Sequence, residues 1–582
     1  VVQVHGRINF DESDKNKDGL LPVHLQSCHT DLNVNGSNIE SSVMEAALPS
    51  FSNRPILGYI HKVTTDENPE GQWEFYSHNM HEDENGDVVY DEYPIGIIPE
   101  SCNAQLVYDE EKKKTYCEVD GYIFEEYSTL RNEIYDAVRE SIKIMGLDRG
   151  RIGEKEWNPF GDFIMPGMTV LIKPNLVMDI NRAGAGTDCL YTHPSVVAPI
   201  IDYTIKALGG RGKIIVGDAP VQECNFEKLI QDSGYQELIS YYQKKGVDIL
   251  LLDLRGAASV EKNGIYHLEE RTNSKGTIID LKQDSEFYEL DEEIKKRLRI
   301  TNYNPETVSG HHTGDTNEYM ISSCVMDADV IINVPKPKTH RIAGMTAALK
   351  NFVGINVRKE YLPHHTMGDH STGGDESDID GVILNLRSKC LDNKNRCQDR
   401  EKYIQAKIWL LGVRIFSLAM KNKSKYREGC WYGNNTICKT IADINKIVYY
   451  ADQNGEMQKK PQRKVLIIAD MIVSGQGNGP LNPHPKNVGM IVIGDNPVYV
   501  DETIAKVMGF DSRKIPTLQL IKKTTGKKYS LLEKDEEILI RSNTNYDGKR
   551  LDEIVMENID AFEPASGWKD HIELIDKGVK TL

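Results

Sequence analysis

The sequence predicts an α/β protein in which helices cover a largely parallel, open sheet, with a small β-rich module at the N-terminus. Along residues 129–530, short apolar runs that suit buried strands alternate with segments of helical periodicity. This alternation is typical of a parallel sheet with helices on both faces. Residues 1–128 differ, because they contain short β-type runs separated by polar stretches.

The chain is long enough for about two to four domains, because 582 residues exceed what one ordinary hydrophobic core accommodates. We expect a truncated, phage-like β-rich module over residues 1–128, an α/β domain over 129–530, and a β/α extension of the same body over 531–582. Within the first module, residues 104–108 and 115–124 flank a polar turn and predict a β-hairpin.

Composition and charge limit the classes of partner. The chain has 39% hydrophobic and 27% charged residues, as expected of a soluble globular protein. A net charge of -18 argues against nucleic acid or a membrane as partner, because binding to phosphate groups needs a basic face. Ten cysteines without a CxxC pair indicate reduced thiols and a cytoplasmic location. The oligomeric state is left open.

The most apolar long segment, residues 404–420, does not have the pattern of a membrane span. It carries Lys407 and Arg414 and is short for crossing a bilayer. We therefore expect a buried or amphipathic helix there, and no transmembrane element in the chain.

The α/β region can be read element by element. Gly146 is placed to end the first helix, because glycine readily adopts the left-handed conformation of a helix C-terminus. The residues from 256 to 304 are polar and irregular, and they predict no clear element. Helices are predicted at residues 130–145, 193–208, 226–245, 343–352, 380–419, 437–452 and 497–508, and strands at 168–172, 213–216, 248–252, 330–332, 464–469 and 489–493.

Polar residues follow the apolar runs of four predicted strands. In a parallel sheet the carboxyl ends of the strands lie along one edge, so these side chains are expected to converge on one crevice. The alternative is that strand ends are polar because they meet solvent. The repetition of the same layout favours a site. The residues are Lys173 with Asn175, Asp218, Lys336 with Lys338, and Asp470.

The lysines of this group suit an anionic ligand. We expect Lys173, Lys336 and Lys338 to hold a phosphate or carboxylate group. Lys350 and Asn351, at the end of a predicted helix, either join this pocket or compensate the helix C-terminus.

The glycine-rich stretch after Asp470 offers further contacts to an anion. The backbone amides near Gly477 and Asn478 either cradle an anion or form a turn without a ligand. The stretch lacks the Gly-Lys-Ser/Thr ending of a Walker loop.

Candidate catalytic groups are carboxylates and imidazoles. Asp218 or Asp470 is the candidate base or metal ligand, and His340 or His365 is the candidate for moving a proton. The loop over residues 362–376 also contains enough imidazole and carboxylate for a divalent metal, for which His364, His365 and Asp375 are the candidate ligands. The alternatives for this loop are a solvated turn, or histidines that bind substrate or transfer protons. No other cofactor is indicated.

Five phrases in the α/β region occur together in a known order: VLIKPNLV, VGDAP, DVIINVPKPKTHRIAGMTAALKNFVGI, LPHH with GGDE, and GQGNGPL followed by GDNPVYVDETIAKVMGF. On these phrases, residues 130–525 resemble the family called domain of unknown function 362. The resemblance implies an α/β fold. It also implies a set of shared polar residues: Lys173, Asn175, Asp218, Lys336, Lys338, His340, Lys350, Asn351, Asn478 and Asp501. Many members of that family carry iron–sulfur modules, but this chain lacks the CxxCxxCxxxCP run.

The N-terminal region resembles a different group. The phrases DGLLPVHLQSCH, NRPILGYIH, PIGIIPESCNAQLVYDE and DGYIFEEYS are similar to the N-terminal part of tailed-phage head proteins of the prohead-protease type. No serine in a recognisable nucleophile setting occurs there, so protease activity is not expected.

Together these observations predict an enzyme that acts on a small or sugar-linked anionic substrate, with a divalent metal as a candidate cofactor. The alternatives are a non-catalytic anion-binding or carrier protein and a phage structural fusion.

Overall fold

The computed structural model describes residues 133–271, 274–379, 381–420, 426–556 and 560–574 in full, and, before them, the backbone of strands β1 to β7. The chain forms two compact units. The first contains residues 1–140, 193–202 and 230–247, and the second contains residues 141–192, 203–229 and 248–582. The predicted module boundary at residue 128 lies outside the described residues.

The first unit contains antiparallel β-structure and helical segments. One sheet has the order β1-β7-β6 and the other β2-β3-β4-β5. The predicted hairpin is confirmed, since β6 pairs with β7 and Ala104 lies opposite Val119. The strands are β1 (Gln3–Asn9), β2 (Leu21–Leu25), β3 (Ile56–Val63), β4 (Gln72–Glu82), β5 (Val88–Ile98), β6 (Asn103–Asp109) and β7 (Lys114–Tyr122).

Among the described residues, three helices that contribute to the first unit are linked through one carboxylate. They are α3 (Glu133–Met145), α4 (Pro194–Leu208) and α6 (Tyr235–Lys244). Asp202 accepts hydrogen bonds from the hydroxyl groups of Tyr135, at 3.0 Å, and Tyr242, at 2.6 Å. Gly146, with φ of 85°, follows α3 in the left-handed conformation, as predicted.

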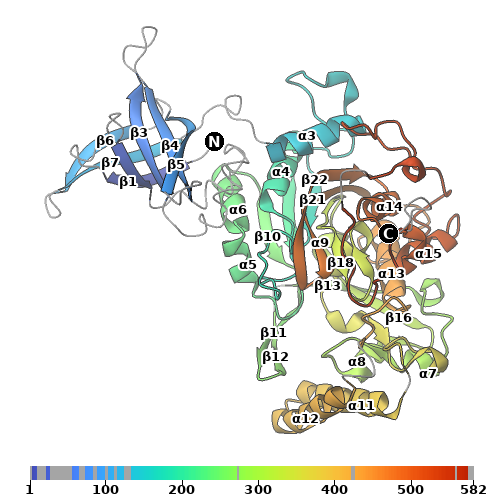
Figure 1. The fold of residues 1–582 in the computed structure, drawn as a ribbon. Helices are drawn as coiled ribbons and strands as arrows, with labels where there is room; N and C mark the ends of the chain where they lie inside the picture. Colours follow the sequence, from blue (N-terminus) through green and yellow to red (C-terminus); the bar gives the residue numbers. More distant parts are fainter. Residues whose placement is uncertain are drawn as a thin grey trace, which may run out of the picture. The chain divides into compact units, whose positions relative to one another are not determined.

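A mainly parallel sheet organises the second unit and confirms the predicted fold class (Figure 1). Its strand order is β10-β9-β8-β17-β21-β18-β19, with β22 paired to β21. The strands are β8 (Thr169–Pro174), β9 (Lys213–Asp218), β10 (Ile249–Asp253), β17 (Val330–Val334), β18 (Lys338–His340), β19 (Gly344–Thr346), β21 (Lys464–Asn478) and β22 (Asn482–Gly494).

The order of the parallel strands reverses between β8 and β17. From β8 the chain adds β9 and β10 on one side, whereas β17 and β21 are added on the other side. In register, Asn333 lies beside Lys173, and Val334 lies beside Pro174. Such a switch point leaves a crevice at the carboxyl ends of the two strands, where open α/β sheets bind ligands.

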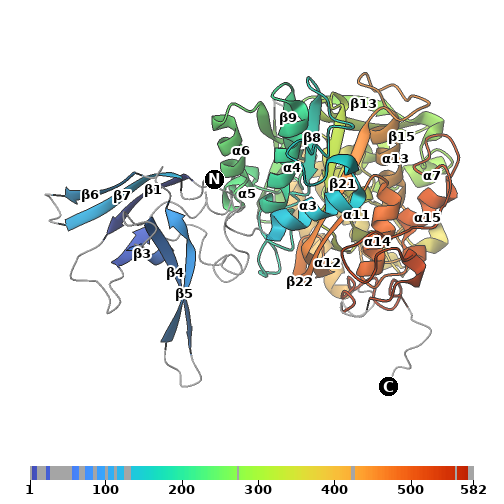
Figure 2. The ribbon, with the colours of Figure 1, turned by 90° about the horizontal axis from the view of Figure 1, so that it is seen from above.

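Helices on the second unit complete one large core. In Figure 2, α13, α14 and α15 lie beyond β21, on the side away from β9. Strand residues such as Ile331 and Ile467 share this core with α13 and with Phe562 and Trp568 near the C-terminus. The helices are α5 (Phe226–Asp232), α10 (Ala348–Asn351), α13 (Ile437–Tyr450), α14 (Pro497–Val507) and α15 (Pro516–Lys523).

The second unit also contains smaller elements outside the main sheet. Helices α11 (Val382–Asp399) and α12 (Tyr403–Ala419) form a hairpin. Among the described residues, no helix has the length and apolarity needed to cross a membrane. Further elements are β11 (Ala257–Lys262), β12 (Ile265–Glu270), β13 (Gly276–Asp280), α7 (Glu292–Lys295), β14 (Leu298–Arg299), α8 (Pro305–Gly310), β15 (His312–Thr313), β16 (Thr316–Ser322), α9 (Ser323–Met326) and β20 (His365–Thr366).

The structure differs from the sequence predictions in four places. The helix predicted over 343–352 is only α10, because residues 338–346 form the β18–β19 hairpin. The glycine-rich loop after Asp470 is the continuation of β21, which pairs with β22. The irregular region 256–304 contains short strands and helices. The described residues after 530 contain a short 3-10 turn, Leu551–Glu553, and isolated bridges in place of β/α elements.

We expect Ile444→Ala to lower the free energy of unfolding by about 2–5 kcal/mol, because a fully buried aliphatic side chain is removed from the core. Urea denaturation followed by tryptophan fluorescence measures this change. The control Val555→Ala removes a side chain that is 55% exposed and should cost less than about 0.5 kcal/mol. Equal effects of the two substitutions would contradict the placement of α13 in the core.

Candidate functional site

The polar residues predicted at the strand ends come together at the switch point. Lys173 is near the end of β8, and Asp218 is the last residue of β9. Lys336 lies in the extended segment between β17 and β18, and Asp470 lies within β21. All four side chains are buried, with exposures of 2% or less. The geometry therefore brings residues from across the chain to one edge of the sheet.

Lys173 is the centre of this group. Its ammonium donates to Asp218 Oδ1 at 2.7 Å, to Asn351 Oδ1 at 3.0 Å and to the carbonyl of Pro174 at 2.9 Å. Burial lowers the pKa of Lys173, while the negative charge of Asp218 opposes that shift. The second oxygen of Asp218 accepts the backbone N–H of Leu176 at 2.6 Å. Both carboxylate oxygens of Asp218 therefore have partners.

A chain of amides links Lys173 to Lys338. Asn351 accepts from Lys173 and also from Asn175 Nδ2, at 3.2 Å. Asn175 Oδ1 in turn accepts from Lys338 Nζ at 2.8 Å. Asn351 is itself held by Asn333, whose Oδ1 accepts from Asn351 Nδ2 at 2.7 Å. These contacts fix the direction in which each amide presents its oxygen.

Lys336 has a carboxylate partner, whereas no carboxylate of the described residues is bonded to Lys338. Lys336 Nζ donates to Asp470 Oδ2 at 2.8 Å, and Asp470 Oδ1 accepts the backbone N–H of Ile472. Lys338 Nζ has two neutral acceptors, Asn175 Oδ1 and the carbonyl of Lys336. Burial, followed by the charge of Lys336, holds the pKa of Lys338 well below its usual value.

Two further lysines add positive charge to this region. Burial, followed by the charge of Lys173, lowers the pKa of Lys350 to about 8. Burial also lowers the pKa of Lys359 to about 7, although the charge of Asp218 opposes the shift. Lys359 Nζ donates to the carbonyl of Ala219 at 2.7 Å. The site thus contains more buried amines than carboxylates.

His340 presents one ring nitrogen as a donor. Its Nδ1 accepts the backbone N–H groups of Ile342 and Ala343, both at 3.1 Å. In the neutral ring the proton is therefore on Nε2. Burial, followed by the charge of Lys350, holds the pKa of His340 well below its usual value. His340 is thus a neutral hydrogen-bond donor that lies near Lys350.

The histidine and carboxylate candidates of the loop over residues 362–376 are not gathered as metal ligands. His364 Nδ1 bonds to the carbonyl of Leu362 at 2.6 Å. Asp375 accepts from the N–H groups of Thr366 and Asn435 and from the hydroxyl of Thr436. In the described part of the chain, no group of three His, Cys, Asp or Glu side chains is arranged to hold a metal ion. The geometry gives the metal hypothesis no support.

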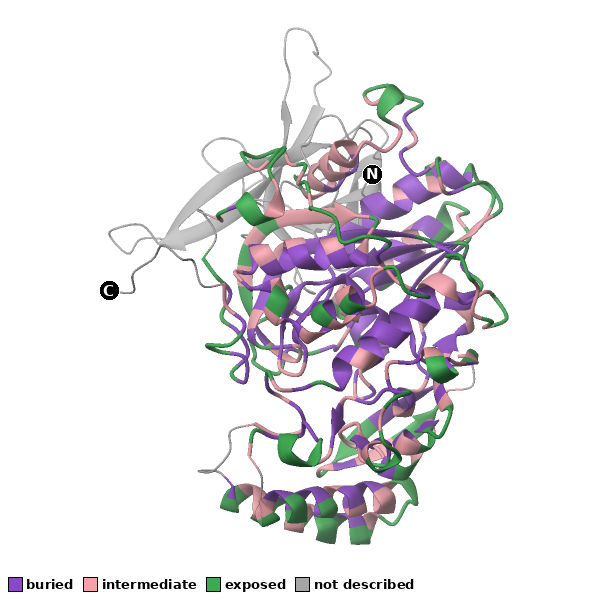
Figure 3. Ribbon diagram, turned by 90° about the vertical axis from the view of Figure 1, so that its right-hand side faces the viewer, coloured by how far each residue is buried: buried purple, intermediate pink, exposed green. Residues whose placement is uncertain are grey.

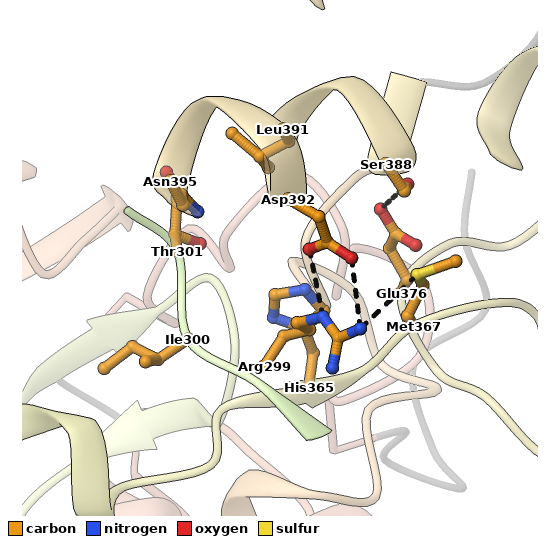
Figure 4. A pocket seen from close by; sticks show the side chains of 10 residues that line it. All are labelled: Arg299, Ile300, Thr301, His365, Met367, Glu376, Ser388, Leu391, Asp392 and Asn395. Carbon is orange, nitrogen blue, oxygen red and sulfur yellow. Dashed lines mark hydrogen bonds and ion pairs between the residues drawn. The ribbon is translucent and has the colours of Figure 1, made fainter. Parts of the chain in front are cut away.

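His365 lies away from the lysines, in a small pocket between β14 and α11 (Figure 4). Arg299 and Asp392 form a two-pronged ion pair beside it, at 3.0 and 3.1 Å. The Nδ1 atom of His365 and Oδ1 of Asn395 are buried without a hydrogen-bond partner among the described residues. The cavity volume is about 10 Å³, enough for roughly one water molecule. His365 is therefore not brought together with Asp218 or Asp470.

Gly477 and Asn478 are used within the fold. The N–H of Gly477 donates to the carbonyl of Glu563 at 2.8 Å, and its carbonyl accepts from the hydroxyl of Thr339. Asn478 Oδ1 accepts the N–H of Ser566 at 3.0 Å. These groups bind the C-terminal segment to β21, so the structure does not present them as an anion cradle.

Sequence reasoning missed two participants, Asn333 and Lys359. Asn333 is a polar residue inside the apolar run of β17, and that interruption is a signal in the sequence. Lys359 follows a segment without a distinctive pattern, and no sequence signal places it near Ala219. The family resemblance also included Asp501, which accepts the N–H groups of Ala348 and Leu349 at the start of α10. Burial raises the pKa of Asp501 to about 7.

The fold and the site define a class: an open, doubly wound α/β protein with a buried lysine cluster at its switch point. The chain belongs to the DUF362 family, a domain of unknown function. The family model matches residues 170–275 and 259–506, which together span more than half of the chain. This match confirms the resemblance drawn from the five phrases.

A second family model and one similar protein also match the chain. A model of the YonD N-terminal domain matches residues 19–178 and so extends past residue 128. Similarity to prohead-protease-type proteins stays a prediction. A thylakoid-associated protein from Synechocystis sp. is 22% identical over 361 residues, which cover 62% of this chain and 68% of that protein.

Gly354 leaves room for the Lys173–Asp218 pair. A Cβ atom at this position would collide with Asp218 Oδ1 and lie 2.9 Å from Lys173 Nζ. We expect Gly354→Ala to lower the free energy of unfolding by about 1–3 kcal/mol, because the ion pair must shift. Thermal or urea unfolding measures the loss. Gly310→Ala is the control, since its Cβ would meet nothing within 4 Å. A neutral Gly354→Ala would contradict the tight packing around the pair.

Removing one member of the buried ion pair should cost more than removing both. Lys173→Met leaves the carboxylate of Asp218 buried without its cation, and we expect a loss of about 3–5 kcal/mol in unfolding free energy. The double variant Lys173→Met, Asp218→Leu should lose less. Urea denaturation of both variants measures the two losses in unfolding free energy. A larger loss in the double variant than in Lys173→Met would show that the unpaired carboxylate of Asp218 is not costly in this network.

Proposed function

We propose that this protein binds a small anionic ligand, with a phosphate or carboxylate group, at the switch point of its sheet. The observation that carries the proposal is the presence of one buried and one partly buried amine without an acidic partner among the described residues. Within that part of the chain the ammonium of Lys338 has only neutral acceptors, and the ammonium of Lys350 makes no hydrogen bond or ion pair. Asp218 and Asp470 are already paired with Lys173 and Lys336.

An anion would supply what these amines lack. A buried ammonium without a counter-charge is costly, and its pKa falls until part of the population is neutral. This is the direction of the pKa shifts of Lys338 and Lys350. A bound anion would restore the protonated form of both amines. The imidazole N–H of His340 would add a neutral donor beside Lys350. Partly exposed Asn175 and Lys350 offer the ligand access from solvent.

A second candidate function is catalysis on that anionic substrate. An amine with a pKa of about 8 is partly neutral near physiological pH, so Lys350 meets the requirement for a general base or a nucleophile. The carboxylates that we predicted for this role, Asp218 and Asp470, are held in ion pairs. In such an enzyme the lysines would transfer protons more readily than these acids.

The cytoplasmic location of the protein stays a prediction.

Binding of inorganic phosphate, sulfate and succinate, measured by isothermal titration calorimetry, tests the proposal. We expect the wild type to bind at least one of these anions, and Lys338→Met and Lys350→Met to weaken binding at least tenfold. Lys459→Met removes an exposed lysine elsewhere and serves as the matched control. Wild-type protein that binds none of the three anions, or site variants that bind like the control, would contradict the proposed site.

The affinity for sulfate should depend on the protonation of Lys350. Sulfate keeps its charge between pH 6 and 10, so the protein alone changes. Because the pKa of Lys350 is about 8 without ligand, affinity should fall as pH rises through 8, about tenfold per unit above it. Lys350→Arg keeps its charge at all these pH values and should remove the fall. An unchanged pH profile in Lys350→Arg would exclude Lys350 as the titrating group.

A further inference from the structure

The outer helix of the α11–α12 hairpin exposes a continuous row of large aliphatic side chains. Figure 3 shows this hairpin at the edge of the body, with exposed residues on its outer side. The row consists of Ile404, Ile408, Leu411, Ile415 and Leu418, with exposures of 80%, 65%, 57%, 54% and 72%. We call these residues the apolar stripe. An exposed apolar patch of this kind marks an interaction surface.

Helical geometry confirms that the stripe is one surface. The five residues are separated by four, three, four and three positions, so at 3.6 residues per turn they fall within an arc of about 80°. The buried residues of the helix, Ala406 and Val413, lie on the opposite side. The stripe therefore points away from the hairpin that carries it.

The charged residues of α12 itself are all basic, although Asp399 and Glu401 precede the helix. Lys407 and Arg414 border the stripe on one side, one heptad apart, and α12 contains no Asp or Glu. From 402 to 427 the sequence contains seven basic residues and no acidic residue, in a chain whose net charge is -18. The seven are Lys402, Lys407, Arg414, Lys421, Lys423, Lys425 and Arg427.

This distribution of charge decides between two occupants. One candidate occupant is a second copy of α12, packed stripe against stripe. In one orientation Lys407 and Arg414 would face the same two cations of the second copy. In the other they would face the uncharged flank of the helix, which consists of Gln405, Gly412 and Ala419. It would supply no carboxylate, and helices that pair through such stripes usually match opposite charges along the flanks. A membrane with anionic headgroups provides both an apolar interior for the stripe and negative charge for the flanking cations.

We propose that α12 docks this protein on the surface of an anionic membrane. The helix lies parallel to the membrane plane, with the apolar stripe buried among the acyl chains and Lys407 and Arg414 at the headgroups. The expectation of no membrane partner came from the net charge of the whole chain, which conceals this local basic segment. The proposal is independent of the anion site.

Co-sedimentation of the full chain with lipid vesicles tests the proposal. We expect binding to vesicles of phosphatidylglycerol and phosphatidylcholine, and at least tenfold weaker binding to phosphatidylcholine alone. Ile408→Ser with Ile415→Ser should weaken binding to anionic vesicles at least tenfold. Lys407→Glu with Arg414→Glu should weaken it similarly, and 0.5 M salt should reduce wild-type binding. Leu539→Ser, which alters an exposed leucine elsewhere, should bind like the wild type.

Three outcomes would overturn the proposal. Wild-type protein could fail to bind anionic vesicles, or the stripe variant could bind as the wild type does. Alternatively, sedimentation velocity could show a wild-type dimer that becomes a monomer in the stripe variant, which would assign the stripe to a second copy. Circular dichroism and thermal unfolding check that each variant is folded, and because the changed side chains are exposed, we expect unfolding temperatures within 2 °C of the wild type.

Discussion

The buried ammonium of Lys173 is the constraint on which the switch point depends. It occupies the position where β8, β9 and the end of α10 meet, and its three acceptors come from Asp218, Asn351 and Pro174. An ammonium in such a place is tolerated only when every proton has an acceptor and the charge has a partner. The contacts of Asp218, Asn351 and Gly354 follow from that requirement, because each either binds the ammonium or leaves room for it.

The same constraint determines the electrostatic character of the site. Lys173 and Lys336 are paired with the carboxylates of Asp218 and Asp470, and among the described residues neither Lys338 nor Lys350 forms an ion pair. The two ion pairs act as structural anchors, and the excess positive charge is concentrated on the other two amines. The amides that position Lys338 are held by their own hydrogen bonds, so the anion that we propose would meet groups that are already oriented.

Sequence patterns predicted the sheet and the meeting of its strand ends, because both follow from local periodicity and from the geometry of parallel strands. Lys173, Asp218 and Lys336 lie at or just beyond strand ends for that reason, whereas Asp470 lies within β21, which continues to Asn478. The β18–β19 hairpin and the length of β21 were not predicted, since glycine and proline favour turns locally and only pairing with a neighbouring strand makes the segment extended. Asp375 was proposed as a metal ligand because its loop is rich in histidine and carboxylate. The sequence does not show that its oxygens accept hydrogen bonds from Thr366, Asn435 and Thr436.

The net charge of the chain is a second example of a sequence property that does not predict local structure or binding. A sum of -18 over 582 residues describes the average field of the chain at a distance. Within a Debye length of about 8 Å, however, a partner meets only nearby charges. The lysine cluster at the switch point and the basic flank of α12 are both small enough to be lost in the sum. In both places the cations stand in a buried or apolar setting, where an anion would be attracted more strongly than at the open surface. The binding properties of an acidic protein therefore depend on where its cations lie relative to its carboxylates, and the total charge does not predict them.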